Sequence, residues 1–174
     1  MSRFIVVTGG ARSGKSRFAE ARVAELAPSG PWLYVATAEA GDDEMRDRIA
    51  RHRQRRGESW RTIEASRDVA GALTREIGAT QAVLIDCATL WLSNRLFDGL
   101  ADDAILAEAD AIAAAARAAP VPVVMVTNEV GAGIVPENAL ARRFRDLAGW
   151  TNQRLAAVAD EVVLVACGLP LRLR

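Results

Sequence analysis

Residues 4–16 read FIVVTGGARSGKS, and this stretch decides the fold of the 174-residue chain. The run from Phe4 to Thr8 is apolar, which is typical of a buried parallel strand. From Ser16 to Leu26, apolar side chains recur at helical spacing until Pro28 interrupts the pattern. A strand that leads through glycines into a helix indicates the start of an α/β fold.

The rest of the chain continues this alternation of strands and helices. Further strands are expected at 32–37, 60–64, 82–86, 123–127 and 162–165, with an edge strand at 168–173. Further helices are expected at 42–56, 69–77, 89–97, 102–118 and 138–159. The pattern predicts one domain, residues 1–174, with a mostly parallel sheet flanked by helices and a C-terminal edge strand.

The residues that follow the predicted strands are the first candidates for a binding site. Ligands of such sheets bind outside the carboxyl ends of the strands. The candidate segments are therefore 9–16, 37–43, Asp86 and 128–133.

The composition excludes several classes of protein. Basic and acidic residues both total 22, so a generally basic nucleic-acid-binding protein is not expected. The apolar runs are too short to span a membrane, and the N-terminal run is too short for a signal peptide, so a cytoplasmic protein is expected. Cys87 and Cys167 lack metal-ligand neighbours at useful spacing, so we expect two buried thiols and no structural zinc site.

The glycine-rich segment matches the phosphate-loop motif G-x-x-x-x-G-K-[ST] in full. Its residues are Gly9, Gly10, Ala11, Arg12, Ser13, Gly14, Lys15 and Ser16. The motif follows a strand and opens a helix, which is the context that it requires. In this motif, backbone N–H groups and the helix N-terminus face phosphate oxygens, the lysine reaches the β- and γ-phosphates, and the serine hydroxyl ligates Mg²⁺. Lys15 is the only lysine of the chain, beside 21 arginines, which argues against an accidental glycine-rich turn.

Asp86 ends an apolar strand, which suits the second acidic residue of a phosphate-loop site. There it would orient Mg²⁺ directly or through water. The alternative is an ordinary carboxylate at a strand end.

Two nucleotide-binding classes are excluded by their own motifs. A Ras-like GTPase reads guanine with N-K-x-D, which is impossible when Lys15 is the only lysine, and the D-x-x-G matches at 68–71 and 146–149 follow no buried strand. Residues 131–133 read GAG but open no helix, so a Rossmann dinucleotide site is not predicted. A small-molecule kinase or a nucleotidyltransferase remains.

The only histidine lies in a strongly charged segment, residues 42–56. On a helix, Arg48, His52, Arg55 and Arg56 share one face. One interpretation is a solvated surface residue in a basic patch. The other is a nucleophile beside a triphosphate, because nearby guanidinium groups disfavour the imidazolium and leave a neutral imidazole.

Taken together, these segments resemble the bifunctional adenosylcobinamide kinase / adenosylcobinamide-phosphate guanylyltransferase family of cobalamin biosynthesis. The resemblance runs nearly end to end. The matching pieces are 9–16, 34–38, 43–45, 48–49, His52, 60–64, 86–87, 127–131, 133–136, 143–146, Gly149, Asn152 and Gln153. The phosphate loop alone is common among proteins, but the whole series is specific.

The resemblance implies two reactions in a RecA-like domain. A nucleoside triphosphate such as ATP or GTP phosphorylates adenosylcobinamide, and GTP then transfers GMP to adenosylcobinamide phosphate, with release of pyrophosphate. It also implies that the guanylyl group passes through His52 and that the enzyme is a homotrimer, whereas the need for Mg²⁺ follows from the phosphate loop and Asp86. By the same resemblance, nucleotide contacts beyond the phosphate loop fall on Ala36, Thr37, Ala38, Arg53, Gln54, Arg55, Arg56, Glu64 and Asp86.

Two alternatives remain open on the sequence. One is a phosphate-loop kinase of another small alcohol with His52 incidental, and the other is a non-catalytic binding protein gated by nucleotide.

Overall fold

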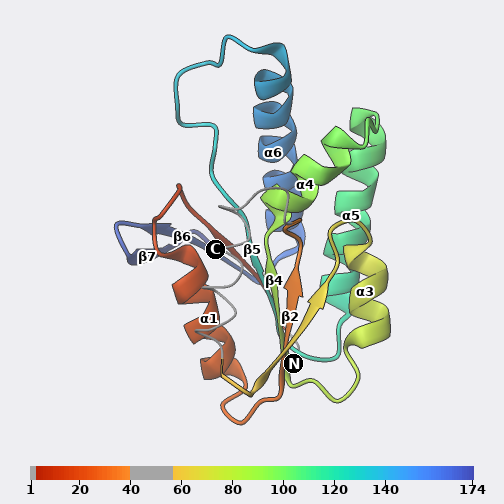
Figure 1. Ribbon diagram of the computed structural model, residues 1–174. Helices are drawn as coiled ribbons and strands as arrows, with labels where there is room; N and C mark the ends of the chain where they lie inside the picture. Colours follow the sequence, from red (N-terminus) through yellow and green to blue (C-terminus); the bar gives the residue numbers. More distant parts are fainter. Residues whose placement is uncertain (1–2, 40–56) are drawn as a thin grey trace.

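The computed structural model describes residues 3–39 and 57–174 (Figure 1). Its strands are β1 Phe4–Thr8, β2 Trp32–Ala36, β3 Trp60–Glu64, β4 Ala82–Asp86, β5 Val123–Val126, β6 Glu161–Ala166 and β7 Leu169–Arg172. Its helices are α1 Lys15–Leu26, α3 Val69–Glu76, α4 Ala88–Phe97, α5 Asp102–Ala118 and α6 Ala139–Val158. These elements confirm the predicted order, and the helix expected at 42–56 lies outside the described residues.

The described strands form one seven-stranded sheet in the order β3-β2-β4-β5-β1-β6-β7. All neighbours are parallel except β6 and β7, which are antiparallel. The predicted α/β fold with a mostly parallel sheet and a C-terminal edge strand is therefore confirmed. Strand β5 lies between β1 and β4, and its Val126 is in register with both Val7 and Asp86. Strand spacing then puts Val7 and Asp86 about 10 Å apart along the carboxyl edge.

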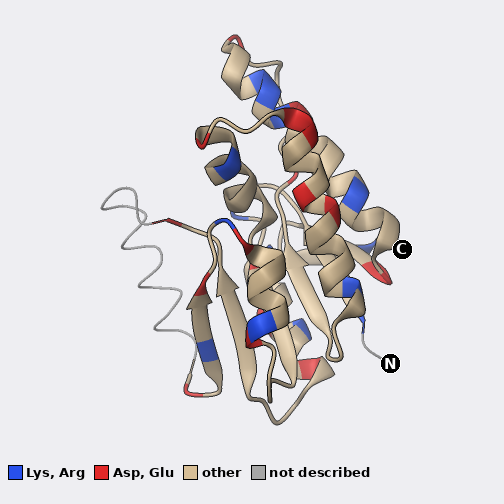
Figure 2. Ribbon diagram, turned by 90° about the vertical axis from the view of Figure 1, so that its right-hand side faces the viewer, with Lys and Arg blue, Asp and Glu red and all other residues tan. Residues whose placement is uncertain are grey.

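Helices cover both faces of the sheet, as Figure 1 shows, with α1 on one face and α3, α4, α5 and α6 on the other. Side chains of each strand alternate between these two layers. Val124 and Val126 pack in the cluster on the α1 side, whereas Val123 and Met125 pack in the cluster with Trp91 of α4. In Figure 2 most of the charged residues lie on helices and at strand ends. The central strands of the sheet therefore contribute mainly aliphatic side chains to the core.

Two helix starts are held by side-chain caps. The carboxylate of Asp68 accepts a hydrogen bond from the N–H of Gly71 at 2.9 Å, and the side chain of Asn138 accepts one from Ala141 at 3.1 Å. Such caps satisfy N–H groups that have no partner within the helix. The match to D-x-x-G at 68–71 is therefore a capped helix start.

The prediction that both cysteines are buried is right for Cys87 and wrong for Cys167, which is exposed. Cys167 and Gly168 form the two-residue turn between β6 and β7, with φ values of 54° and 79°. A tight hairpin of this kind needs positive φ at both central residues, and here it leaves the Cys167 side chain exposed. None of the described helices is long and apolar enough to cross a membrane.

Replacing Thr151 of α6 with valine is expected to stabilise the protein. Thr151 is 2% exposed, and its hydroxyl has no hydrogen-bond partner among the described residues. Removing a buried hydroxyl without a partner relieves a desolvation cost, which we expect to add about 1 kcal/mol to the free energy of unfolding. Thermal unfolding should shift upward by about 2–4 °C. Thr74→Val is the matched control, since the exposed Thr74 hydroxyl bonds the Ala70 carbonyl at 3.1 Å; a lower unfolding temperature for Thr151→Val would contradict the prediction.

Candidate phosphate-binding site

The phosphate loop is held in a conformation that requires glycine at two positions. Gly9 has a φ of 155°, and a Cβ atom there would lie 2.3 Å from the carbonyl oxygen of Val165. Gly14 has a φ of 95° and directly precedes α1. The backbone N–H of Gly168 donates to the carbonyl of Ser13 at 2.9 Å. The turn of the β6–β7 hairpin therefore supports the loop from outside.

The first turn of α1 is open to an anion. No side chain caps this helix, and no acidic residue lies in its first turn. A helix start without a side-chain cap can present its N–H groups to a ligand, and the helix dipole favours a negative one. This is the environment that the phosphate-loop motif predicts.

Lys15 lies folded over the same loop. Its ammonium donates to the carbonyl of Gly10 at 2.9 Å, and the residue is only 8% exposed. Ser16 follows it in the first turn and is half-buried. A charged donor and a hydroxyl thus lie side by side with the loop amides, as phosphate and Mg²⁺ binding requires.

Asp86 stands at the carboxyl end of β4, on the same edge of the sheet. Its carboxylate accepts a hydrogen bond from the Tyr34 hydroxyl at 3.1 Å. The backbone beyond it is fixed by Thr37, whose hydroxyl bonds the N–H and the carbonyl of Cys87, each at 2.7 Å. Ala36 is in register with Asp86 on one side and with Glu64 on the other. Consequently the ends of β2, β3 and β4 lie at one level.

The electrostatics of Cys87 connect β4 with the phosphate loop. Burial is the main cause that raises the pKa of this thiol to about 12; the neighbouring Asp86 carboxylate acts in the same direction and the Lys15 ammonium in the opposite one. Both charges therefore lie close enough to affect one buried group. The thiol stays protonated at neutral pH, so Cys87 is not a nucleophile here.

The side chains of Ser16 and Asp86 fit a magnesium ion by their chemistry. Both offer oxygen, which Mg²⁺ prefers, and the ion is usually held by one or two protein groups plus substrate phosphates. Within residues 3–39 and 57–174 there is no group of three His, Cys, Asp or Glu side chains that could hold a metal without such help. A metal at this edge would therefore depend on bound phosphates.

The structure describes the positions of most of the predicted site residues. It brings Gly9–Ser16 and Asp86 to one edge of the sheet, with Ala36–Ala38 and Glu64 further along that edge. The predicted contacts His52, Arg53, Gln54, Arg55 and Arg56 lie outside the described residues. Sequence reasoning gave no role to Thr89, Thr127 and Asn152, although their side chains form a hydrogen-bond network beside the loop. The sequence did contain one signal for this network, since the polar residue Thr127 directly follows the apolar strand at 123–126.

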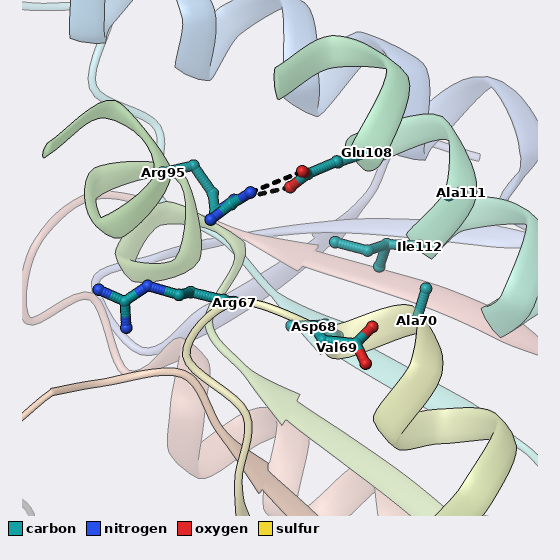
Figure 3. Close-up of a pocket in the computed structure, with 8 residues that line it drawn as sticks. All are labelled: Arg67, Asp68, Val69, Ala70, Arg95, Glu108, Ala111 and Ile112. Carbon is teal, nitrogen blue, oxygen red and sulfur yellow. Dashed lines mark hydrogen bonds and ion pairs between the residues drawn. The ribbon is translucent and has the colours of Figure 1, made fainter. Parts of the chain in front are cut away.

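A separate pocket of about 240 Å³ lies between α3, α4 and α5 (Figure 3). The carboxylate of Glu108 accepts two hydrogen bonds from Arg95, each at 2.7 Å, at its edge. None of the predicted nucleotide-binding residues lines it. This pocket lies on the helical layer opposite α1 and is distinct from the phosphate loop.

Comparison with known proteins gives a match over nearly the whole chain. The sequence profile of a family described as "Cobinamide kinase / cobinamide phosphate guanyltransferase" (CobU) matches residues 5–173. The "Bifunctional adenosylcobalamin biosynthesis protein CobU" of Escherichia coli K12 is 46% identical over 182 aligned residues, covering 98% of this chain and 99% of the relative. The "Bifunctional adenosylcobalamin biosynthesis protein CobP" of Pseudomonas aeruginosa is 44% identical over 173 residues, covering 97% and 96%.

Proposed function

Because this chain belongs to the cobinamide kinase / cobinamide phosphate guanyltransferase family, we propose that it catalyses both reactions within one domain of residues 1–174. It phosphorylates adenosylcobinamide with a nucleoside triphosphate and then transfers GMP from GTP to the product. The single observation that carries this proposal is the phosphate loop with Lys15 in place, on the same sheet edge as Asp86.

In the kinase step, the aminopropanol hydroxyl of adenosylcobinamide attacks the γ-phosphorus. A new P–O bond forms, the bond to the β-phosphate oxygen breaks, and the hydroxyl proton is released. Lys15 and the loop N–H groups stabilise charge on the phosphate oxygens, as in other phosphate-loop enzymes. Ser16 and Asp86 would hold Mg²⁺, which neutralises phosphate charge when bound.

In the second reaction, we propose that the imidazole of His52 attacks the α-phosphorus of GTP. A P–N bond forms and pyrophosphate leaves. The phosphate of adenosylcobinamide phosphate then attacks the same phosphorus and releases the imidazole, giving adenosylcobinamide-GDP. A covalent carrier splits one displacement into two easier ones. The contacts proposed for the nucleotide are the phosphate loop, Ala36, Thr37, Ala38, Arg53, Gln54, Arg55, Arg56, Glu64 and Asp86.

Incubation with labelled GTP tests this proposal directly. An acid-labile, alkali-stable GMP adduct on the protein, followed by transfer to cobinamide phosphate, is the expected result. Phosphorylated cobinamide without any adduct would instead make the protein a kinase only. Tight nucleotide binding without turnover would make it a binding protein and overturn the proposal.

Replacing Asp86 with alanine is expected to raise the Mg²⁺ concentration needed for both reactions. The carboxylate is one of the two protein oxygens proposed to orient the metal, and loss of a group that orients a bound metal costs about tenfold or more in metal affinity. Activity measured over a Mg²⁺ titration checks this. Asp103→Ala removes an exposed carboxylate at the start of α5 and serves as the control. An unchanged titration for Asp86→Ala would leave Asp86 as an ordinary strand-end residue.

We further propose a homotrimer that acts in the cytoplasm. Support for assembly comes from large apolar side chains that the single chain leaves exposed, among them Trp150 of α6 and Leu169 and Leu171 of β7. Sedimentation at micromolar concentration is expected to give three times the 18.6 kDa mass of the chain. A species of 18.6 kDa would contradict the trimer.

A further inference from the structure

Four residues beside the phosphate loop form a closed ring of hydrogen bonds. The backbone N–H of Asn128 donates to the Thr89 hydroxyl at 2.8 Å, and the two threonine hydroxyls of Thr89 and Thr127 lie 3.3 Å apart. The Thr127 hydroxyl donates to Oδ1 of Asn152 at 2.7 Å, and Nδ2 of Asn152 donates to the Asn128 carbonyl at 3.0 Å. The ring thus begins and ends on the backbone of Asn128.

The direction of every bond in this ring is determined. Because Thr127 donates its only hydroxyl proton to Asn152, the proton between the two threonines must come from Thr89. Each hydroxyl then donates once and accepts once. Thr89 and Thr127 are both buried, the latter 2% exposed, so the bond between their hydroxyls is shielded from water.

The backbone of Asn128 continues β5 past its last assigned residue. The N–H of Thr127 donates to the Val7 carbonyl at 2.9 Å, and the N–H of Glu129 donates to the Gly9 carbonyl at 3.1 Å. This two-residue spacing is that of a parallel ladder, so the chain stays extended through Glu129. The first residues of the phosphate loop are therefore paired directly with the segment that carries Asn128.

Strand alternation places Asn128 on the same face as the phosphate loop. Val124 and Val126 pack on the α1 side, and the Thr127 side chain bonds residues of α4 and α6 on the other side. Asn128 therefore projects to the α1 side. Since Val126 is level with Val7 and Asp86, Asn128 lies level with Gly9, between the loop and the end of β4.

We propose that the side-chain amide of Asn128 contacts the transferred phosphoryl group, and that Thr89, Thr127 and Asn152 position it. This rests on the proposed kinase reaction. An amide N–H is a neutral donor that can bond a γ-phosphate oxygen between Lys15 and Asp86 without adding charge to the site. The ring holds both the N–H and the carbonyl of the Asn128 backbone, so the point from which the donor side chain projects is fixed before the nucleotide binds. A fixed starting point favours the preorganisation that stabilisation of a transition state requires.

The test is steady-state kinetics of cobinamide phosphorylation by Asn128→Ala. Loss of one oriented donor is expected to lower kcat by about 10²-fold, with a much smaller change in the KM for nucleotide. The GMP adduct forms at the α-phosphorus, whereas Asn128 is proposed to contact the γ-phosphoryl group. The rate of adduct formation is therefore expected to fall by less than about tenfold. Asn138→Ala, which removes an equivalent amide from the start of α6, is the control and should leave kcat unchanged.

The ring is tested separately with Thr127→Val and Thr127→Ser. Valine removes the hydroxyl and is expected to lower kcat by about tenfold, whereas serine keeps the hydroxyl and should restore most of it. Thr151→Val is the control for replacing a buried threonine with valine, because the Thr151 hydroxyl has no hydrogen-bond partner among the described residues. A kcat for Asn128→Ala within about threefold of wild type would overturn the proposed contact between Asn128 and the phosphoryl group. Equal kcat values for Thr127→Val and Thr127→Ser would overturn the positioning role of the ring. A wild-type protein that forms no phosphorylated cobinamide would overturn the proposed function and this inference with it.

Discussion

Alanine in place of Lys15 is expected to reduce cobinamide phosphorylation by about 10²-fold or more, as removal of one transition-state donor does in other enzymes. The ammonium is in direct contact with the phosphate loop through the Gly10 carbonyl. In motifs of this kind the lysine holds the β- and γ-phosphates. Turnover of labelled ATP with cobinamide, measured at saturating nucleotide, gives the effect on kcat.

Arg17→Ala is the matched control for this substitution. Arg17 is an exposed basic residue in the same helix, so its loss removes one positive charge from α1 without touching the loop. Its kinase activity is expected to stay near that of wild type. Near-normal turnover by Lys15→Ala, in a protein whose thermal unfolding is unchanged, would make the phosphate-loop assignment wrong.

His52→Ala is expected to abolish the covalent GMP adduct and the transfer of GMP to cobinamide phosphate. The proposed carrier supplies the nitrogen that forms the P–N bond, and alanine has no group to replace it. The kinase step needs only attack by the substrate hydroxyl, so phosphorylation of cobinamide should persist at least in part. Protein labelled with GTP at the α-phosphate, isolated under alkaline conditions, reports the adduct.

His52→Asn serves as the second substitution, because it keeps a polar side chain but cannot form a phosphoramidate. It is expected to behave as alanine does in the adduct assay. A His52→Ala protein that still forms the adduct at normal yield would exclude His52 as the carrier. Loss of both activities in a folded variant would instead assign it to nucleotide positioning for both steps.

The phosphate loop illustrates how much of a site a sequence can predict. Its motif is contiguous, so the residues that bind one phosphate group are already neighbours along the chain, and the structure confirms the strand before it and the helix after it. The place of Asp86 at the end of β4 could be predicted as well, since the end of an apolar strand is visible in the sequence. The ring around Asn128 could not, because Thr89, Thr127 and Asn152 meet only after three separate elements have packed.

The error at Cys167 has the same physical origin. A cysteine after an apolar run has the composition of a core residue, but its burial depends on the turn geometry that follows. That geometry is a property of the β6–β7 pairing, which also brings the Gly168 N–H to the Ser13 carbonyl. A prediction based on local apolar content therefore buried Cys167, which the hairpin exposes.

The sequence by itself determined the alternation of strands and helices, the phosphate loop and the acidic end of β4, because hydrophobic period and contiguous motifs are local properties of the chain. Only the tertiary structure decided that β5 lies between β1 and β4, and so which side chains stand between Lys15 and Asp86. Strand order and register depend on which apolar faces pack together across the whole sheet, and many orders satisfy the same local pattern. The position of Asn128 beside Gly9 is a consequence of that packing.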